Sequence, residues 1–116
     1  MNPSLLCIIA SDPRSSARPA EAIRIAAGVG AWQKVDITVY LRDAAVLALS
    51  EFTDEFVDED NFTRYFPIVA EAGRPIYAQR GAPLLNEIGE SAMKFEEIDD
   101  DRLAALAAGS NYVLRF

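Results

Sequence analysis

The chain has 116 residues, of which 51% are hydrophobic, so it can bury one core and is not a disordered polypeptide. Its formal net charge of −7 argues against nucleic acid or an anionic membrane as the main partner. No apolar run in the sequence approaches the length of a membrane span. We therefore expect a single domain over residues 1–116, located in the cytoplasm.

Histidine is absent, and Cys7 is the one cysteine of the sequence. The lack of imidazole excludes Ser-His-Asp and Cys-His catalysis and also zinc sites built on histidine. A single thiol cannot form an intrachain disulfide. The GVG at residues 28–30 comes at the end of a predicted helix rather than after a strand, which is the wrong place for a nucleotide-binding loop. We expect no cofactor.

Apolar runs typical of buried strands alternate with helical patterns along the chain. Residues 5–10 are continuously apolar, as in a strand buried on both faces, and Pro19 fits the first turn of a helix that continues to Trp32. The other expected strands are 35–41, 74–78, 93–98 and 111–116, and the other expected helices are 42–50, 61–73, 82–89 and 99–109. The helix at 61–73 should be bent or begun around Pro67 and end at Gly73. This order predicts an α/β fold with a five-stranded, mostly parallel sheet.

The carboxyl edge of such a sheet is where ligands usually approach. Polar side chains that follow the first three strands form a candidate ligand-binding set: Ser11, Asp12, Arg14, Arg42, Gln79 and Arg80. The arginines can bind a small anion near helix starts. Alternatively, they pair with Asp12, Asp43 or neighbouring acids, as is common at protein surfaces.

Two acidic segments, residues 51–60 and 96–101, hold 11 of the 18 acidic residues. We interpret them as solvated, self-repelling surface, with a recognition surface for a basic partner as the alternative. The acids of the first segment recur at helical spacing and lack the ligand order of an EF-hand. We expect no metal site.

Three segments in succession, LLCIIASDP, AIRIAAGVGAW and VDITVYLRDAAVLAL, resemble the opening of DsrE/DsrF-like proteins. The turn after IYAQRG and the last strand, YVLRF, fit the same family, which includes persulfide-relay subunits such as TusD. The resemblance implies a three-layer α/β/α sandwich. It also implies assembly into trimers or hexamers, with itself or with a related subunit.

In the sulfur-transferring members of this family, the cysteine that holds the persulfide lies in the turn after the third strand. The corresponding residues here are Ala78, Gln79, Arg80 and Gly81, and none contains sulfur. Neither an amide nor a guanidinium can replace a thiolate in sulfur exchange. The resemblance therefore implies a non-catalytic protein that is an interaction or small-ligand module, or a partner subunit in sulfur relay.

Two other functions stay open. One is a sulfurtransferase that uses Cys7, although burial in an apolar strand would raise the pKa of this thiol and block access to it. The other is an enzyme or binding protein for a small anionic metabolite at the strand ends. For assembly, we expect FTRYFPIV, with Phe62 and Phe66, and the terminal NYVLRF to supply an interface, because their aromatic surface exceeds what a small sheet needs. The alternative is that Phe62 and Phe66 belong to the intramolecular core.

Overall fold

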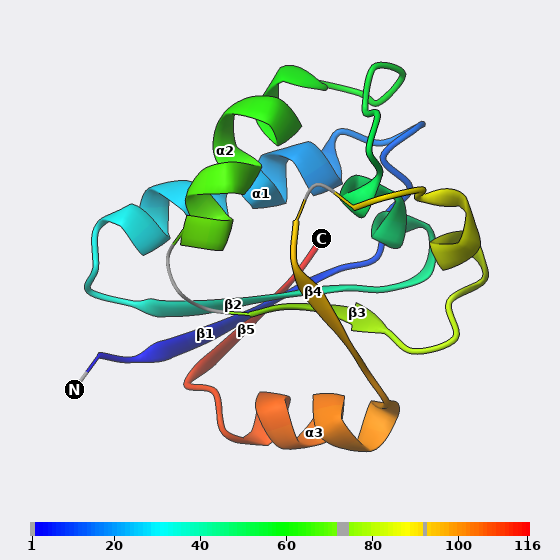
Figure 1. Cartoon of the computed structure of the whole chain (residues 1–116). Coiled ribbons are helices and arrows are strands. Elements are labelled where there is room, and N and C mark those ends of the chain that lie inside the picture. The colour runs from blue at the N-terminus through cyan, green and yellow to red at the C-terminus, as the bar shows by residue number, and fades with distance from the viewer. Residues whose placement is uncertain (1, 72–74, 92) are drawn as a thin grey trace.

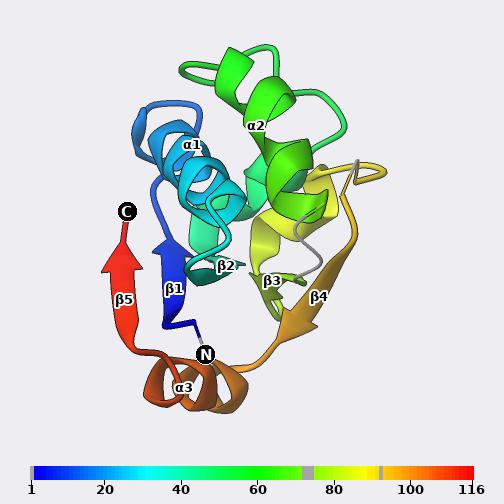
Figure 2. The same ribbon diagram turned by 90° about the vertical axis from the view of Figure 1, so that its left-hand side faces the viewer.

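A computed structural model describes residues 2–71, 75–91 and 93–116 of the chain. Five strands form one sheet, and each pair of neighbouring strands is parallel. In chain order the strands are β1 Ser4–Ile9, β2 Asp36–Leu41, β3 Ile76–Gln79, β4 Phe95–Ile98 and β5 Tyr112–Arg115. The strands form one layer (Figure 1), and their spatial order is β4-β3-β2-β1-β5, so β4 and β5 are the two edges (Figure 2). The predicted five-stranded parallel sheet is confirmed.

Helices cover both faces of the sheet and give the predicted three layers (Figure 2). One face carries α1, α2 and the two 3-10 helices η1 and η2, whereas the other face carries α3. The bounds of these helices are α1 Arg18–Ala31, η1 Asp43–Leu49, α2 Asp60–Glu71, η2 Pro83–Glu87 and α3 Asp100–Ala108. The chain steps from β1 to β4 in one direction and then returns across the sheet to β5. Because crossovers between parallel strands are right-handed, the returning connection must pass over the opposite face.

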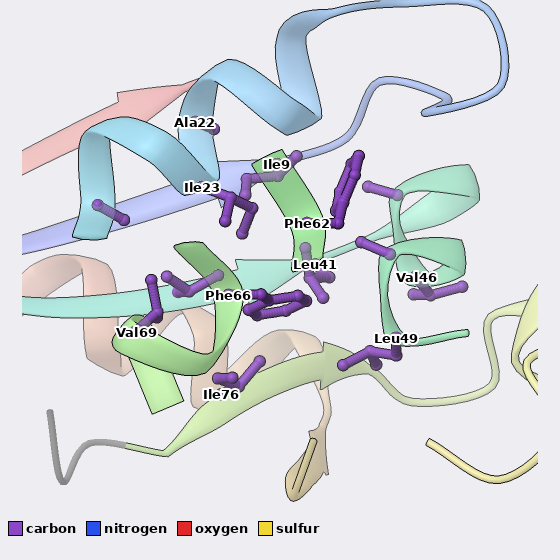
Figure 3. Packing of buried hydrophobic residues seen from close by; sticks show 14 of the residues in the cluster. Ile9, Ala22, Ile23, Leu41, Val46, Leu49, Phe62, Phe66, Val69 and Ile76 are labelled. Atoms are coloured by element: carbon purple, nitrogen blue, oxygen red, sulfur yellow. The ribbon is translucent and has the colours of Figure 1, made fainter. Parts of the chain in front are cut away.

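The main core lies between the sheet and the helices α1 and α2 (Figure 3). Ile9 of β1 and Leu41 of β2 are fully buried there, as is Ile23 of α1. Val46 of η1 and Phe66 of α2 belong to the same cluster. Burial on both faces of the central strands explains why their sequences are continuously apolar.

Phe62 and Phe66 lie in this core and not at the surface. Their side chains are 3% and 2% exposed, and the ring of Phe62 packs edge-on against Phe56 with centroids 5.6 Å apart. The expectation that these two residues supply an oligomer interface is therefore wrong. Their spacing of four residues places both on one face of α2, and this face is turned toward the sheet.

A second, smaller core lies on the other face of the sheet, against α3. It contains Leu6, Ile8, Tyr40, Tyr77 and Ile98, which come from β1, β2, β3 and β4. Side chains of α3 pack on this cluster, but none of the residues of α3 is itself fully buried. This layer of the sandwich is therefore a single, thinly packed helix.

Three local features differ from the pattern expected from the sequence. The short helices η1 and η2 are 3-10 helices of seven and five residues. Pro67 lies inside α2, which begins at Asp60, so the alternative that a helix begins at Pro67 is wrong. Gly73, the predicted end of this helix, lies outside the described residues. Residues 51–59 form turns and bends, so the helical spacing of their acids does not correspond to a helix.

Candidate functional site

The connections that follow β3 and β4 turn to opposite faces of the sheet. After β3 the chain passes into η2, on the face that carries α1 and α2, whereas after β4 it passes into α3 on the opposite face (Figure 1). In open α/β sheets, a ligand crevice forms where neighbouring connections separate in this way. The residues at this point are Gln79 and Arg80 from one strand end and Asp99 from the other.

Gln79 connects the turn after β3 to the end of β2. Its Oε1 accepts a hydrogen bond of 2.9 Å from the backbone N–H of Asp43. Asp43 is the first residue of η1 and has a positive φ of 51°, which few residues other than glycine, asparagine and aspartate adopt readily. The neighbouring Arg42 places its Nε 3.5 Å from a carboxylate oxygen of Asp43. Arg42, Asp43 and Gln79 therefore form one connected group.

Arg80 contacts the end of β4. Its backbone N–H donates to the carbonyl of Ile98 over 2.9 Å, and its Nη1 lies 3.7 Å from a carboxylate oxygen of Asp99. Asp99 also caps α3 by accepting a 2.8 Å hydrogen bond from the backbone N–H of Arg102. The side chains of Arg80 and Asp99 are both more than half exposed, so this ion pair contributes little to stability.

Asp12 and Arg14 form a separate, closed pair in the loop after β1. The guanidinium of Arg14 donates to both carboxylate oxygens of Asp12, with a shortest contact of 2.8 Å, and the backbone N–H of Arg14 donates as well. These hydrogen bonds lower the pKa of Asp12. Arg14 lines a shallow pocket together with Phe52 and with Glu87, the last residue of η2. Ser11 makes no side-chain hydrogen bond within the described part of the chain.

The six predicted site residues are thus divided between two places. Arg42, Gln79 and Arg80 gather at the ends of β2 and β3, beside the end of β4, while Ser11, Asp12 and Arg14 follow β1, where Asp12 and Arg14 pair with each other. All three arginines in the set take part in an ion pair, as the alternative to anion binding predicted. At the carboxyl edge of the sheet, these ion pairs and the hydrogen bond of Gln79 connect the ends of β2, β3 and β4.

Cys7 lies within β1, which is an inner strand of the sheet. In the strand register it is flanked by Val39 on one side and Leu114 on the other. Its side chain is 2% exposed, and burial raises the pKa of the thiol from 9.0 to about 12. The predicted burial of Cys7 is confirmed.

Three further residues near the carboxyl edge were absent from the predicted set. Arg115 and Asp100 line a groove between α3 and the sheet, together with Arg42 of the predicted set, and the third residue, Tyr40, has its hydroxyl buried on the same side of the sheet. Arg115 is the last residue of β5, which ends at the same edge of the sheet as β1 to β4. Because ligands usually approach this edge, Arg115 could have been predicted as a site residue from the sequence. Tyr40 gives no such signal, because a tyrosine in an apolar strand is usually a core residue.

In residues 2–71, 75–91 and 93–116, no three His, Cys, Asp or Glu side chains lie close enough together to hold a metal ion. Within those ranges, no helix has the length and apolar character needed to cross a membrane.

Sequence comparisons give no relatives, whereas structural comparison does. No model of a protein family matches this chain, and no curated protein matches its sequence. Among solved structures, it is similar to the crystal structure of the YchN protein from E. coli, with a TM-score of 0.81 and 17% sequence identity over 100% of both chains. YchN has a DsrE-like fold. This chain therefore has a DsrE-like fold too. At this identity the likeness concerns the fold, and at that level the resemblance found in the sequence is confirmed.

Proposed function

We propose that this protein is a non-catalytic member of the DsrE-like group that acts as an interaction or small-ligand module, for instance as a partner subunit in sulfur relay. One observation carries the proposal. The sulfur-transferring proteins of the resembled family have their cysteine in the turn after the third strand, whereas this chain has Gln79 at the end of β3 and Arg80 and Gly81 in the turn that follows. The side chain of Gln79 is instead used to hold the backbone of Asp43.

Cys7 does not replace the missing thiol. Sulfur exchange requires a thiolate that can reach the sulfur of a donor. Burial raises the pKa of the Cys7 thiol to about 12, which keeps it protonated at pH 7, and its sulfur is enclosed by neighbouring strands. The protonated state of the thiol and its burial both support a protein that does not transfer sulfur and acts instead by binding a partner or a small ligand.

Self-association is part of the proposal. β5 is an edge strand, and its side chains Tyr112 and Leu114 are 61% and 41% exposed. The other edge, β4, exposes Glu96 and Glu97, and charged side chains of this kind discourage pairing between sheet edges. We therefore place the contact between subunits at β5, within the trimer or hexamer that the family resemblance implies, formed with itself or with a related subunit.

A sulfur-transfer assay tests the proposal that this protein does not accept sulfur. The intact protein is incubated with a low-molecular-weight persulfide, whose outer sulfur would pass to a protein thiolate and leave the donor as a thiol. We expect no gain of one sulfur atom in the intact mass. A sulfur gain that disappears in Cys7→Ser would overturn the proposal.

Two gain-of-function variants test whether the turn keeps the geometry of a sulfur site. Gln79→Cys places a thiol at a half-buried position beside Arg80, whose charge favours the thiolate. Ala78→Cys places the thiol at a position that is fully buried in the main core. We expect Gln79→Cys to react with a thiol reagent and to accept sulfur, and Ala78→Cys to be the slower of the two. The reverse order of reactivity would show that the turn faces the other way.

A further inference from the structure

An open groove of about 550 Å³ lies between α3 and the carboxyl ends of β1 and β5. α3 crosses the face of the sheet opposite α1 and α2, and β5 forms the adjacent edge (Figure 2). Apolar side chains line most of the groove, among them Ile8 of the sheet and Leu103 and Ala107 of α3. Its volume falls in the range of about 300–1,000 Å³ typical of small-molecule sites.

Two guanidinium groups lie at the wall of this groove. Arg115 forms no ion pair or hydrogen bond through its side chain within the described ranges. Arg42 contacts Asp43 through Nε at 3.5 Å, and its two Nη groups have no described partner. Asp100 also lines the groove. The hydrogen-bond donors that remain unpaired in the groove are therefore those of the two guanidinium groups. Arginine typically forms charge-assisted, often bidentate, hydrogen bonds with a carboxylate.

A buried hydroxyl independently marks the same place. The Oη atom of Tyr40 is buried and has no hydrogen-bond partner among the described residues. Arg42, Asp100 and Asp43 are the charged groups that act on it, and the first two of them line the groove. Tyr40 is also the direct strand neighbour of Ile8, which lines the groove, and both side chains lie on the side of the sheet that faces α3. Buried hydroxyls normally have a partner, so an unpaired one here points to a polar group that is missing from the free protein.

The strand register brings these groups within the span of one small molecule. Arg115, Ile8 and Tyr40 are direct neighbours in one row across β5, β1 and β2. Neighbouring strands are about 4.8 Å apart, so the row from Arg115 to Tyr40 spans roughly 10 Å. All three residues face α3, because Ile8 and Tyr40 belong to the core on that side.

From this juxtaposition we propose that the groove is a binding site for a small monocarboxylate with an apolar body. The carboxylate binds the guanidinium groups of Arg115 and Arg42, and the hydroxyl of Tyr40 is the additional donor at that end. The apolar body packs against Leu103 and Ala107. This proposal rests on the function proposed above and names the ligand class of the small-ligand module.

The charges near the groove favour a monoanion over a dianion such as phosphate. Asp100 lines the groove and Asp43 is next to Arg42, so two carboxylates lie near the proposed anion site. The chain as a whole has a net charge of −7. A single negative charge can be matched by the unused donors, whereas a second one would be opposed by these acids.

The experiment measures binding of 4-phenylbutyrate to the full chain by calorimetry. The neutral alcohol 4-phenylbutanol has the same apolar body without the charge, and butyrate has the charge with a short body. We expect 4-phenylbutyrate to bind more tightly than either analogue. Arg115→Gln and Arg42→Gln should each weaken its binding by about tenfold, as expected for the loss of a charge-assisted hydrogen bond. Arg24→Gln is the matched control, because Arg24 pairs with Glu21 on α1 at the other face.

Tyr40→Phe completes the set, and it should weaken binding of 4-phenylbutyrate and leave binding of the alcohol unchanged. Equal affinities for the carboxylate and the alcohol would overturn the proposal. So would wild-type affinity in both Arg115→Gln and Tyr40→Phe. Failure of this proposal is distinguishable from failure of the proposed function, because the latter would appear as sulfur gained by Cys7 in the mass assay.

Discussion

The side chain of Gln79 holds the backbone of Asp43 through a hydrogen bond of 2.9 Å between two segments that are 36 residues apart in sequence. This contact ties the turn after β3 to the first residue of η1. The conformation of Asp43, with φ at 51°, is unfavourable for most residues, so the bond helps to keep η1 in its register. The side chain of Gln79 thus has a structural role in this protein.

Gln79→Ala should lower the free energy of unfolding by about 1 kcal/mol, because the N–H of Asp43 loses its acceptor. Denaturant unfolding measures this difference. Asn86→Ala is a suitable control, since Asn86 is an exposed residue of η2 without a described side-chain hydrogen bond. Equal losses in the two variants would mean that the Gln79 bond does not stabilise the fold.

Burial of Cys7 makes stability depend on pH in the alkaline range. The pKa of the thiol is raised from 9.0 to about 12 in the folded chain, so the unfolded chain loses this proton first. The contribution of Cys7 is therefore complete below about pH 9 and is lost as the pH rises from about 9 to about 12, by at most about 1.4 kcal/mol per pH unit. Cys7→Ala lacks this contribution.

The test compares unfolding free energies of wild type and Cys7→Ala at pH 8 and pH 10. The difference between the two proteins should shrink by roughly 1 kcal/mol at the higher pH. Comparing the two proteins at each pH cancels the titration of groups that they share. A constant difference would show that Cys7 is no harder to ionise in the folded chain than in the unfolded one.

The alternation of apolar strands and helices was sufficient to predict the layers of the fold. Residues 5–10 and 35–41 match β1 and β2 closely, because strands buried on both faces have continuous apolar sequences. The 3-10 form of η1 was not predictable in this way. Five successive residues of η1, from Ala45 to Leu49, are buried, so an α-helical period does not describe the segment.

The candidate site was predicted only in part, for a geometric reason. Sequence shows that Asp12, Arg42 and Gln79 follow strands and so lie at one edge of the sheet. It does not show toward which face each loop turns, and this depends on the crossovers. Asp12 is bonded within its own loop, whereas Arg42 and Gln79 lie together with Asp43.

The location of Phe66 in the main core leads to a prediction about stability. Phe66→Ala should lower the free energy of unfolding by about 3–5 kcal/mol, because it leaves a cavity between α2 and the sheet. Ile68, two residues further along α2, is 40% exposed, and Ile68→Ala should cost about 1 kcal/mol or less. Comparable losses in both variants would contradict the orientation of α2.

Tyr40→Phe should leave the free protein as stable as the wild type or up to about 1 kcal/mol more stable, although Tyr40 is fully buried. The ring stays in place, and the substitution removes a hydroxyl that lacks a partner among the described residues. Thermal and denaturant unfolding without added carboxylate measure the effect. A loss of more than about 1 kcal/mol would show that the hydroxyl already has a hydrogen-bond partner in the free protein.

The exposed side chains of β5 predict how the protein assembles. Tyr112 pairs with Leu5 and Leu114 with Cys7 in the sheet register, so both point to the face that carries α1. They nevertheless remain 61% and 41% exposed, which leaves an apolar strip along an open edge. We expect light scattering to show an oligomer at micromolar concentration, and the double variant Tyr112→Lys, Leu114→Lys to shift it to monomer, since lysines on an edge strand oppose pairing.

Trp32→Lys provides the matched control for this assembly experiment. Trp32 is 64% exposed, comparable with Tyr112, but it lies at the end of α1. Its replacement should leave the oligomer intact, because the proposed contact involves β5. A wild-type protein that is monomeric at micromolar concentration would rule out self-association. An oligomer that dissociates in Trp32→Lys and persists in the β5 variant would move the interface from the sheet edge to α1.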